Sequence, residues 1–157
     1  MKPDIELVKE WFSIDPETGI LTRLKKHRDS IPDTLNPDRE RVDFMGVRYR
    51  VSHIAWVLYY GKWPDDEIDH EDHNKKNHRK KNLREASHAQ NTRNRRFFNP
   101  NGKGVTFRKD RYFDQWQAQI AYEGKKIHLG FYPTPEEAAE AYKVAAIQYH
   151  GEFACLD

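Results

Sequence analysis

Three short polar motifs in the middle of the chain contain side chains that could carry out metal-dependent hydrolysis. An apolar, strand-like segment ends in Asp69-His70, and a long basic loop follows it. Asn82 stands at the end of that loop, and Asn91 lies on the next predicted helix. Carboxylate and amide oxygens suit Mg²⁺ or Mn²⁺, and a histidine with an ordinary pKa of about 6.5 can take a proton from water at neutral pH. These residues together indicate cutting of a phosphodiester backbone.

The distribution of charge indicates a nucleic-acid partner. Residues 73–96 contain nine Lys or Arg and one acid, a net charge of +8, which leaves −6 for the rest of a chain whose total is +2. A basic block within an acidic remainder is typical of phosphate binding. A solvated polar loop would show the same bias, and charge patterning alone leaves that alternative open.

Composition limits the fold and the setting. The 157 residues suffice for one ordinary domain or two small ones, and 37% hydrophobic with 33% charged residues predicts small cores. The single cysteine, Cys155, excludes an internal disulfide and a Cys-rich zinc site. The sequence contains neither an apolar run of roughly 18 residues nor a signal-peptide core. We therefore expect an intracellular, cytoplasmic protein whose partner is double-stranded DNA, with neither a membrane nor a small molecule as partner.

Hydrophobic patterning divides the chain into an N-terminal part, residues 1–96, a linker, 97–102, and a C-terminal part, 103–157. The linker follows from its Asn-Pro and Asn-Gly turn signals. Periodicity and capping residues predict the following elements of the N-terminal part: a helix over 4–14, a strand from Ile20, a loop over 25–42, a strand over 47–51, a helix capped by Ser52, a strand over 67–70, a return at 82–84 and a helix over 87–96 capped by Ser87.

The C-terminal part has the clearest pattern in the chain. Apolar and polar residues alternate around 105–108, 116–120 and 126–129, with turns at Asp110-Arg111 and Glu123-Gly124. A helix capped by Thr134 follows, and its buried stripe is predicted to comprise Ala138, Ala141, Tyr142, Ala145 and Tyr149. We therefore expect a small three-stranded antiparallel sheet packed on one helix, and an α+β protein overall.

The other face of this sheet carries side chains that could contact phosphates or the major groove of DNA. They are Thr106, Arg108, Gln117, Gln119, Lys126 and His128. An ordinary solvated face is the alternative. Further candidate DNA contacts come from the basic block and its neighbourhood: Arg84, Arg93, Asn94, Arg95, Arg96 and Lys103.

Residues 47–96 resemble the HNH nucleases, specifically the homing endonucleases encoded by phages and introns. The resemblance rests on His53-Ile54-Ala55-Trp56, Gly61-Lys62-Trp63-Pro64, Ile68-Asp69-His70, Asn82-Leu83-Arg84 and Gln90-Asn91-Thr92-Arg93-Asn94. It implies a ββα-metal fold in which Asp69 and Asn91 are metal ligands and His70 is the general base. Asn82 would hydrogen-bond across the loop and hold its shape.

One motif departs from the family pattern. Asn77-His78-Arg79 stands where the family often has Asp-Asn-Arg. His73 and His78 are therefore additional possible ligands, and Zn²⁺ stays an alternative to Mg²⁺ or Mn²⁺. His53, at a helix start, is interpreted as a packed residue rather than a ligand.

Residues 103–157 resemble the plant-type Apetala/ethylene-response-factor DNA-binding domain (AP2/ERF), which is also found appended to phage HNH proteins. The resemblance rests on Gly104-Val105, Trp116-Gln117-Ala118-Gln119-Ile120, Leu129-Gly130, Ala138-Ala139, Ala141-Tyr142, Ala145-Ala146 and Gly151. It implies that the sheet binds DNA. The arginine-rich reading face of the plant domain is diluted here, so its target sequences do not carry over.

The two resemblances together predict a metal-dependent, site-recognising DNA endonuclease of a phage or another mobile element, working inside an infected bacterial host. One site on one chain, a monomer or weak dimer, would nick a single strand. Two other classes remain open: a non-catalytic DNA-binding regulator that retains the HNH fold, and a structural or recombination accessory in which a metal only stabilises the fold.

Overall fold

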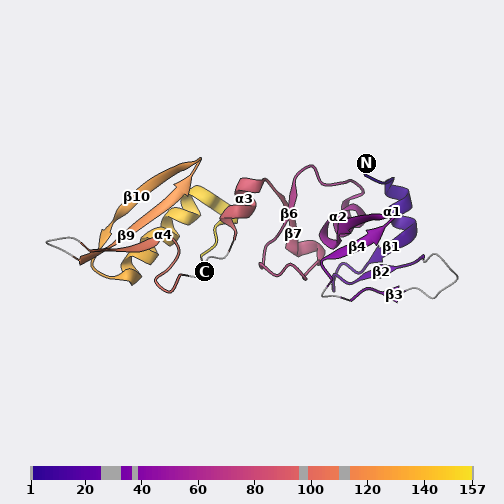
Figure 1. Ribbon diagram of the computed structural model, residues 1–157, viewed down its shortest axis with the longest axis horizontal. Coiled ribbons are helices and arrows are strands. Elements are labelled where there is room, and N and C mark those ends of the chain that lie inside the picture. The colour runs from indigo at the N-terminus through magenta and orange to yellow at the C-terminus, as the bar shows by residue number, and fades with distance from the viewer. Residues whose placement is uncertain (1, 26–32, 37–38, 96–98, 110–113, 157) are drawn as a thin grey trace. The chain divides into compact units, whose positions relative to one another are not determined.

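The computed structural model describes residues 2–25, 33–36, 39–95, 99–109 and 114–156 of the protein. The chain forms two compact units, Met1–Asn91 and Thr92–Asp157. Both combine helices with small antiparallel sheets (Figure 1), and the predicted α+β class is confirmed. The boundary between the units lies between Asn91 and Thr92, before the linker that was predicted at 97–102. Residues 97–98 of that linker lie outside the described part of the chain.

Helices and short strands alternate along the first unit. In chain order they are α1 (Ile5–Trp11), β1 (Phe12–Ile14), β2 (Leu21–Arg23), β3 (Asp33–Thr34), β4 (Arg41–Phe44), β5 (Val47–Arg50), α2 (Val51–Tyr60), β6 (Glu67–His70), a 3-10 turn (Lys80–Asn82), β7 (Leu83–Ala86) and α3 (His88–Arg93), which runs across the boundary. Strands β1, β2 and β3 form one sheet, while β4–β5 and β6–β7 form hairpins.

Three local expectations for this unit need correction. The first helix ends at Trp11, because Phe12 enters strand β1 and packs its ring against Phe44 at 5.3 Å between ring centroids. The segment expected to be loop, 25–42, contains β3, which pairs with β2, and the first two residues of β4, which pairs with β5. Ser52 does not cap α2, because Arg50 takes the N-cap position and Ser52 is buried in the first turn.

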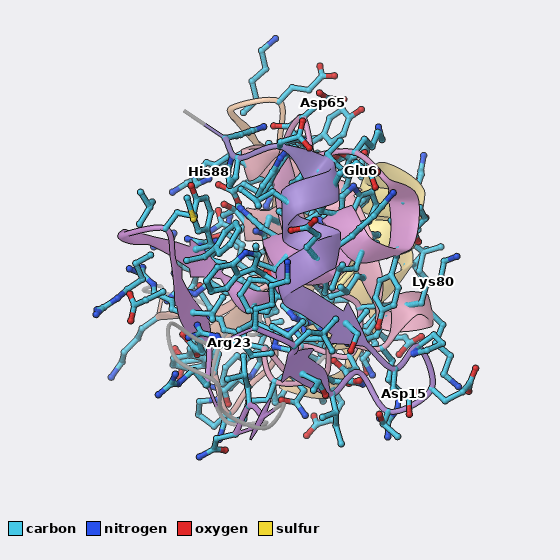
Figure 2. All side chains as sticks on the ribbon, turned by 90° about the vertical axis from the view of Figure 1, so that its right-hand side faces the viewer. Glu6, Asp15, Arg23, Asp65, Lys80 and His88 are labelled. Atoms are coloured by element: carbon cyan, nitrogen blue, oxygen red, sulfur yellow. The ribbon has the colours of Figure 1, made fainter. Side chains whose placement is uncertain are left out.

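An apolar core joins the N-terminal elements to α2. Its buried side chains are Val8, Phe12, Leu21, Leu35, Val42, Phe44, Val51, Ile54 and Val57. A second cluster, made of Ala55, Trp56, Ile68 and Leu83, fixes another side of α2 to the β6–β7 hairpin. Full burial of an aliphatic or aromatic side chain stabilises a fold by about 1.5–3 kcal/mol. Helix α2 is therefore the element that positions the hairpin. Charged side chains such as Glu6 and Asp65 project from the surface of this unit (Figure 2).

A turn near the N-terminus, residues 15–19, lies directly against the loop between β6 and β7, and we call it the bracing turn. The backbone N–H of Lys80 donates to the carbonyl of Pro16 at 3.3 Å, and Arg79 Nε donates to the carbonyl of Glu17. Gly19 has φ +72°, and a Cβ there would come within 2.5 Å of the backbone nitrogen of Arg79. The loop that contains His78 is therefore held by residues outside the family-like segment.

The second unit has the predicted architecture. Strands β8 (Val105–Lys109), β9 (Asp114–Tyr122) and β10 (Lys125–Tyr132) form an antiparallel sheet in the order β10-β9-β8, followed by α4 (Pro135–His150) and a 3-10 turn (Gly151–Phe153). Thr134 caps α4, since its Oγ1 accepts from the N–H of Glu137 at 3.3 Å. Glu123 and Gly124 form the β9–β10 turn with φ +50° and +73°, whereas Asp110-Arg111 lies outside the described residues.

Helix α4 covers one face of this sheet. Buried side chains from the helix and the strands form two adjoining clusters: Val105, Ala118 and Ala138, and Ile120, Tyr142, Ala145 and Ala146. Cys155 is buried, while Ala141 and Tyr149, two residues of the predicted stripe, are only half-buried. No helix in the described ranges is long and apolar enough to cross a membrane.

A register shift in β10 changes which residues reach the outer face of the sheet. The pairing of β10 with β9 shifts between His128 and Gly130, and Phe131 then pairs with Gln117. A β-bulge of this kind inserts a residue and redirects the side chains that follow it. Phe131 consequently lies on the polar face with 53% of its surface exposed. Phe107 was expected inside, but it is 45% exposed because it lies near the end of the edge strand β8.

Candidate functional site

Asp69, His70, Asn82 and Asn91, the four candidate residues, lie on the β6–β7 hairpin, its connecting loop and α3. Cross-strand pairing places Asp69 opposite Arg84 and His70 opposite Leu83. Helix α3 starts directly after β7, because the Ser87 hydroxyl accepts from the N–H of Gln90 at 3.3 Å and serves as the expected N-cap. The helix ends at Arg93 rather than Arg96. Strand β6 thus supplies Asp69 and His70, the 3-10 turn before β7 supplies Asn82, and α3 supplies Asn91. The order of strand, return strand and helix is that of the predicted ββα arrangement.

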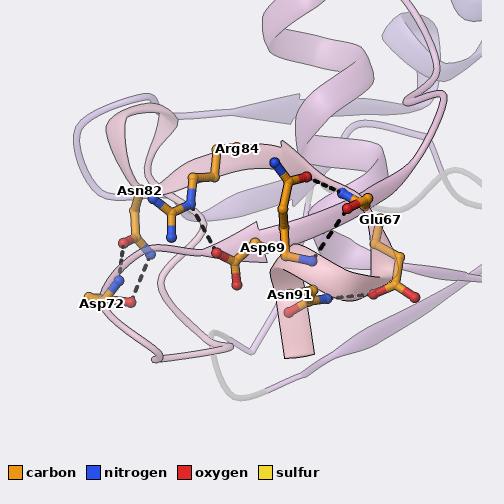
Figure 3. A network of polar contacts seen from close by, with 8 residues as sticks. Glu67, Asp69, Asp72, Asn82, Arg84 and Asn91 are labelled. Carbon is orange, nitrogen blue, oxygen red and sulfur yellow. Dashed lines mark hydrogen bonds and ion pairs between the residues drawn. The ribbon is translucent and has the colours of Figure 1, made fainter. Parts of the chain in front are cut away.

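Asp69 is buried, with 5% of its surface exposed. Its Oδ2 accepts from Arg84 Nε at 2.9 Å (Figure 3). Only 17% of the Arg84 side chain is exposed, so its cation neutralises a carboxylate that would otherwise be costly to bury. The contact between Arg84 and DNA stays a prediction. In the structure, Arg84 also forms an ion pair with Asp69.

Asn82 organises the loop between β6 and β7. Its Oδ1 accepts from the N–H of Asp72 at 3.0 Å, and its Nδ2 donates to Asp72 Oδ1 at 2.9 Å and to the carbonyl of Asn77 at 2.7 Å (Figure 3). Burial alone would raise the pKa of Asp72, but these and neighbouring hydrogen bonds outweigh it and lower the pKa. The contacts match the shape-holding role that the resemblance implies for Asn82.

The ring of His70 faces the ring of His78. Their Nε2 and Nδ1 atoms are 3.3 Å apart. Burial lowers the pKa of both rings, that of His78 to about 4, while Asp72 and Asp69 partly oppose the effect on His70. A neutral imidazole is the form that can accept a proton, so His70 has the protonation state that a general base requires at neutral pH.

His78 is almost completely buried, with 4% of its surface exposed. Its Nε2 has no hydrogen-bond partner among the described residues. Tyr59 donates its hydroxyl to the carbonyl of His78 at 2.9 Å. His78 was expected to be a solvated loop residue or a ligand, whereas in the structure it is a buried neighbour of His70.

Asn91 reaches from α3 to Glu67 on β6. Its Nδ2 donates to Glu67 Oε2 at 2.6 Å (Figure 3). His88 Nδ1 is 2.9 Å from the other oxygen, Oε1. The hydrogen bonds from His88 and Asn91 lower the pKa of Glu67, which is therefore ionised at neutral pH. Glu67 was absent from the candidates, although its position two residues before Asp69 on a strand predicts that both side chains share a face.

The four candidates lie around one hairpin, but each has its own polar partner. Within the described ranges, no three His, Cys, Asp or Glu side chains are grouped so that they could hold a metal ion. The predicted site requires one carboxylate and one amide oxygen, with water and phosphate as the remaining ligands. Asp69 and Asn91 supply hard oxygen donors of the type that Mg²⁺ or Mn²⁺ prefers, so the residues present fit such an ion.

The residues that follow Asn91 differ in their access to solvent. Asn94 is buried with 4% of its surface exposed, so a direct DNA contact would require this segment to rearrange. The guanidinium of Arg93 lies 5.2 Å from the ring centroid of Tyr122. Lys103 donates to the carbonyls of Arg93 and Arg95 at 2.8 and 2.9 Å, and burial lowers its pKa. Arg95 is exposed, and Arg96 lies outside the described residues.

A polar network crosses the outer face of the C-terminal sheet. Arg108 Nε donates to Gln117 Oε1 at 2.7 Å, and Gln117 Nε2 is 3.0 Å from His128 Nδ1. Phe131 stacks beside His128 with ring centroids 4.7 Å apart. Thr106 and Lys126 are exposed and Gln119 is half-buried. The six predicted contacts therefore come from the face opposite α4.

The segment that contains the β6–β7 hairpin is similar to known proteins. Residues 49–93 match the HNH endonuclease family, which confirms the resemblance inferred for 47–96 at that level. The chain is also similar to a curated protein of Acanthamoeba polyphaga mimivirus named an uncharacterized HNH endonuclease, with 37% identity over 102 residues.

This similarity has definite limits. It covers 64% of this chain and 52% of the viral protein, so the chain spans about half the length of its curated relative. The family match ends at residue 93 and does not reach the C-terminal sheet. No solved structure matches the chain.

Proposed function

We propose that the protein is a metal-dependent DNA endonuclease of the HNH type that recognises its target site and nicks one strand. The observation that carries the proposal is the β6–β7 hairpin, which presents Asp69 and His70 at the end of one strand within the family match. Asn82 and Asn91 flank the returning strand. Double-stranded DNA is the proposed substrate, since the basic block and the outer face of the C-terminal sheet supply positive charge for its phosphates.

In the proposed reaction His70 removes a proton from a water molecule that attacks the scissile phosphorus. Asp69 and Asn91 would hold Mg²⁺ or Mn²⁺, which when bound offsets negative charge on the phosphate and on the leaving 3′ oxygen. Arg84 maintains the position of Asp69, and Asn82 maintains the shape of the loop that follows His70. The half-buried His70 imidazole, whose pKa is lowered by its partial burial, is suited to this proton transfer.

The proposal is tested by following conversion of supercoiled plasmid to open circles with and without Mg²⁺. An endonuclease of this type produces open circles only when a divalent ion is present. Binding without any cleavage in both conditions would instead support a DNA-binding regulator that retains the fold. A gain in thermal stability with the ion, again without cleavage, would support the accessory role.

Removal of either proposed metal ligand is expected to weaken the response of cleavage to the metal. Asp69→Ala and Asn91→Ala should each slow cleavage and raise the Mg²⁺ concentration needed for half-maximal rate, because each removes one protein oxygen donor. Chelation by EDTA should stop the wild-type protein, and Mn²⁺ or Mg²⁺ should restore it. Asp66→Ala is the control, since this acid is exposed and precedes the hairpin. Full activity after chelation would refute the metal assignment.

The outer face of the C-terminal sheet is proposed to anchor the DNA, in the manner of the AP2/ERF-like domain that it resembles. Arg108→Ala and Lys126→Ala should each weaken binding to all sequences and reduce the slope of log affinity against log salt by about one unit. Lys143→Ala is the control, because it removes an exposed cation from α4, on the other side of the sheet. Unchanged slopes in both variants would show that this face does not bind phosphates.

Gln119→Ala should act differently from the loss of either cation. A side-chain amide can pair bidentately with adenine, so its removal should blur discrimination at one base pair while leaving the salt slope unchanged. Binding to a randomised target library measures this directly. Equal sequence preference in wild type and variant would remove Gln119 from the reading residues.

A further inference from the structure

Glu67 lies beside the proposed metal ligands but has no assigned role in the reaction. It occupies β6 two residues before Asp69, and alternate residues of a strand point to the same face. Its cross-strand partner is Ala86, whose small side chain leaves that face accessible to α3. Asn91 and His88, three residues apart on α3, both reach the Glu67 carboxylate.

We propose that Glu67 is a positioning residue that orients the Asn91 carboxamide so that its oxygen, and not its nitrogen, faces the metal. This inference rests on the proposed function, since it concerns how that same site binds its ion. Glu67 itself is not proposed as a ligand. It acts through Asn91, whose Nδ2 lies 2.6 Å from Glu67 Oε2.

The chemistry of the two groups fixes the orientation. An ionised carboxylate has only acceptor atoms, whereas a carboxamide has a donor end and an acceptor end. The short contact with Glu67 must therefore be made by the NH2 group of Asn91, and the carbonyl oxygen occupies the other branch of the amide. In Figure 3 that oxygen is drawn on the side of Asn91 nearer to Asp69, with Glu67 on the opposite side.

A second contact keeps the carboxylate in place. His88 Nδ1 is 2.9 Å from Glu67 Oε1, so each carboxylate oxygen faces one residue of α3. Hydrogen bonding to a carboxylate also raises electron density on the ligand oxygen, and loss of such outer partners commonly costs about 10- to 100-fold in metal affinity.

The test measures Mn²⁺ binding to the full-length, DNA-free protein by calorimetry, independently of cleavage. Glu67→Ala should weaken Mn²⁺ binding about 10- to 100-fold, and Asn91→Ala should weaken it as well. The double variant should bind no more weakly than Asn91→Ala alone, because Glu67 has no effect once its target is removed. Asp66→Asn, which removes a neighbouring exposed charge, should bind like wild type.

Glu67→Gln provides a conservative rescue if Glu67→Ala destabilises the hairpin. A glutamine oxygen can still accept from Asn91, so this variant should retain an intermediate Mn²⁺ affinity. NMR spectra of the asparagine-labelled, metal-free protein give an independent readout. The Asn91 side-chain NH2 signals should move upon Glu67→Gln and should be insensitive to Asp66→Asn.

The outcomes separate this inference from the proposed function. Wild-type Mn²⁺ affinity in Glu67→Ala, together with weakened binding in Asn91→Ala, would overturn the role of Glu67 and leave the metal site intact. A loss from Glu67→Ala that persists in the Asn91→Ala background would overturn positioning in favour of a direct charge effect. Equal Mn²⁺ binding by wild type and Asn91→Ala would refute the metal assignment itself, and the role of Glu67 with it.

Discussion

Replacing His70 by alanine is expected to slow plasmid cleavage by about 100- to 10,000-fold, the usual contribution of a general base. The variant loses the imidazole that would accept a proton from water, but it loses no phosphate contact and no metal ligand. DNA affinity measured at a fixed salt concentration should therefore change little. Single-turnover nicking rates, combined with binding measurements on the same plasmid, separate the two effects.

His73→Asn is the matched control for His70→Ala. His73 is another histidine near the hairpin, and it has φ +63°, a conformation that asparagine tolerates better than most residues. Its replacement should leave the rate of cleavage close to that of wild type. If His70→Ala cleaves at the wild-type rate while His73→Asn does not, the base has been assigned to the wrong histidine.

Gly19→Ala is expected to destabilise the first unit by about 2–5 kcal/mol, which combines left-handed backbone strain with a steric clash. The added Cβ would lie 2.5 Å from the backbone nitrogen of Arg79 and 2.6 Å from the carbonyl carbon of His78. Backbone atoms cannot rotate away as a flexible side chain can, so the bracing turn must separate from the loop. Urea denaturation gives the loss of stability, and the nicking assay gives its effect on the site beside His78.

Gly46→Ala separates the clash from the backbone strain. Gly46 has φ +74°, close to the value at Gly19, but no described atom lies within 4 Å of the place that an added Cβ would occupy. This control should lose only about 1–2 kcal/mol, the cost of a left-handed conformation. Equal destabilisation by both substitutions would contradict the close approach between the bracing turn and the loop.

Features that depend on local pattern could be predicted from the sequence. The β6–β7 hairpin, the Ser87 cap and the three-stranded sheet with its helix all follow from periodicity or capping residues within short windows. Strand β4 was missed because its first residues, Arg41 and Val42, end a polar, Pro-punctuated segment that resembles loop. The register shift at His128 was missed because strict alternation gives no sign of an inserted residue.

The polar partners of the site could be predicted only in part, because they are contacts between separate elements. Asp69, His70, Asn82 and Asn91 stand out by type and spacing, whereas Glu67 and His78 become relevant only when α3 and the loop return to the hairpin. Arg84 was selected for its charge as a DNA contact, and its pairing with Asp69 follows from a cross-strand register that the sequence does not specify. The assignments of all these residues to catalysis or DNA binding stay predictions.

The shared core of the first unit limits how its family-matched segment could be exchanged between proteins. Residues 49–93 match the family, yet Ile54 and Val57 on α2 pack on Val8 and Phe12 from the N-terminal elements. Trp63 also donates its indole N–H to the carbonyl of Pro3 at 2.9 Å. A chimera that transplants the matched segment alone would expose this apolar surface and release the loop beside His78. The transferable module is therefore the larger piece that begins with α1, and gene fusions or designed nucleases built from this chain should retain it.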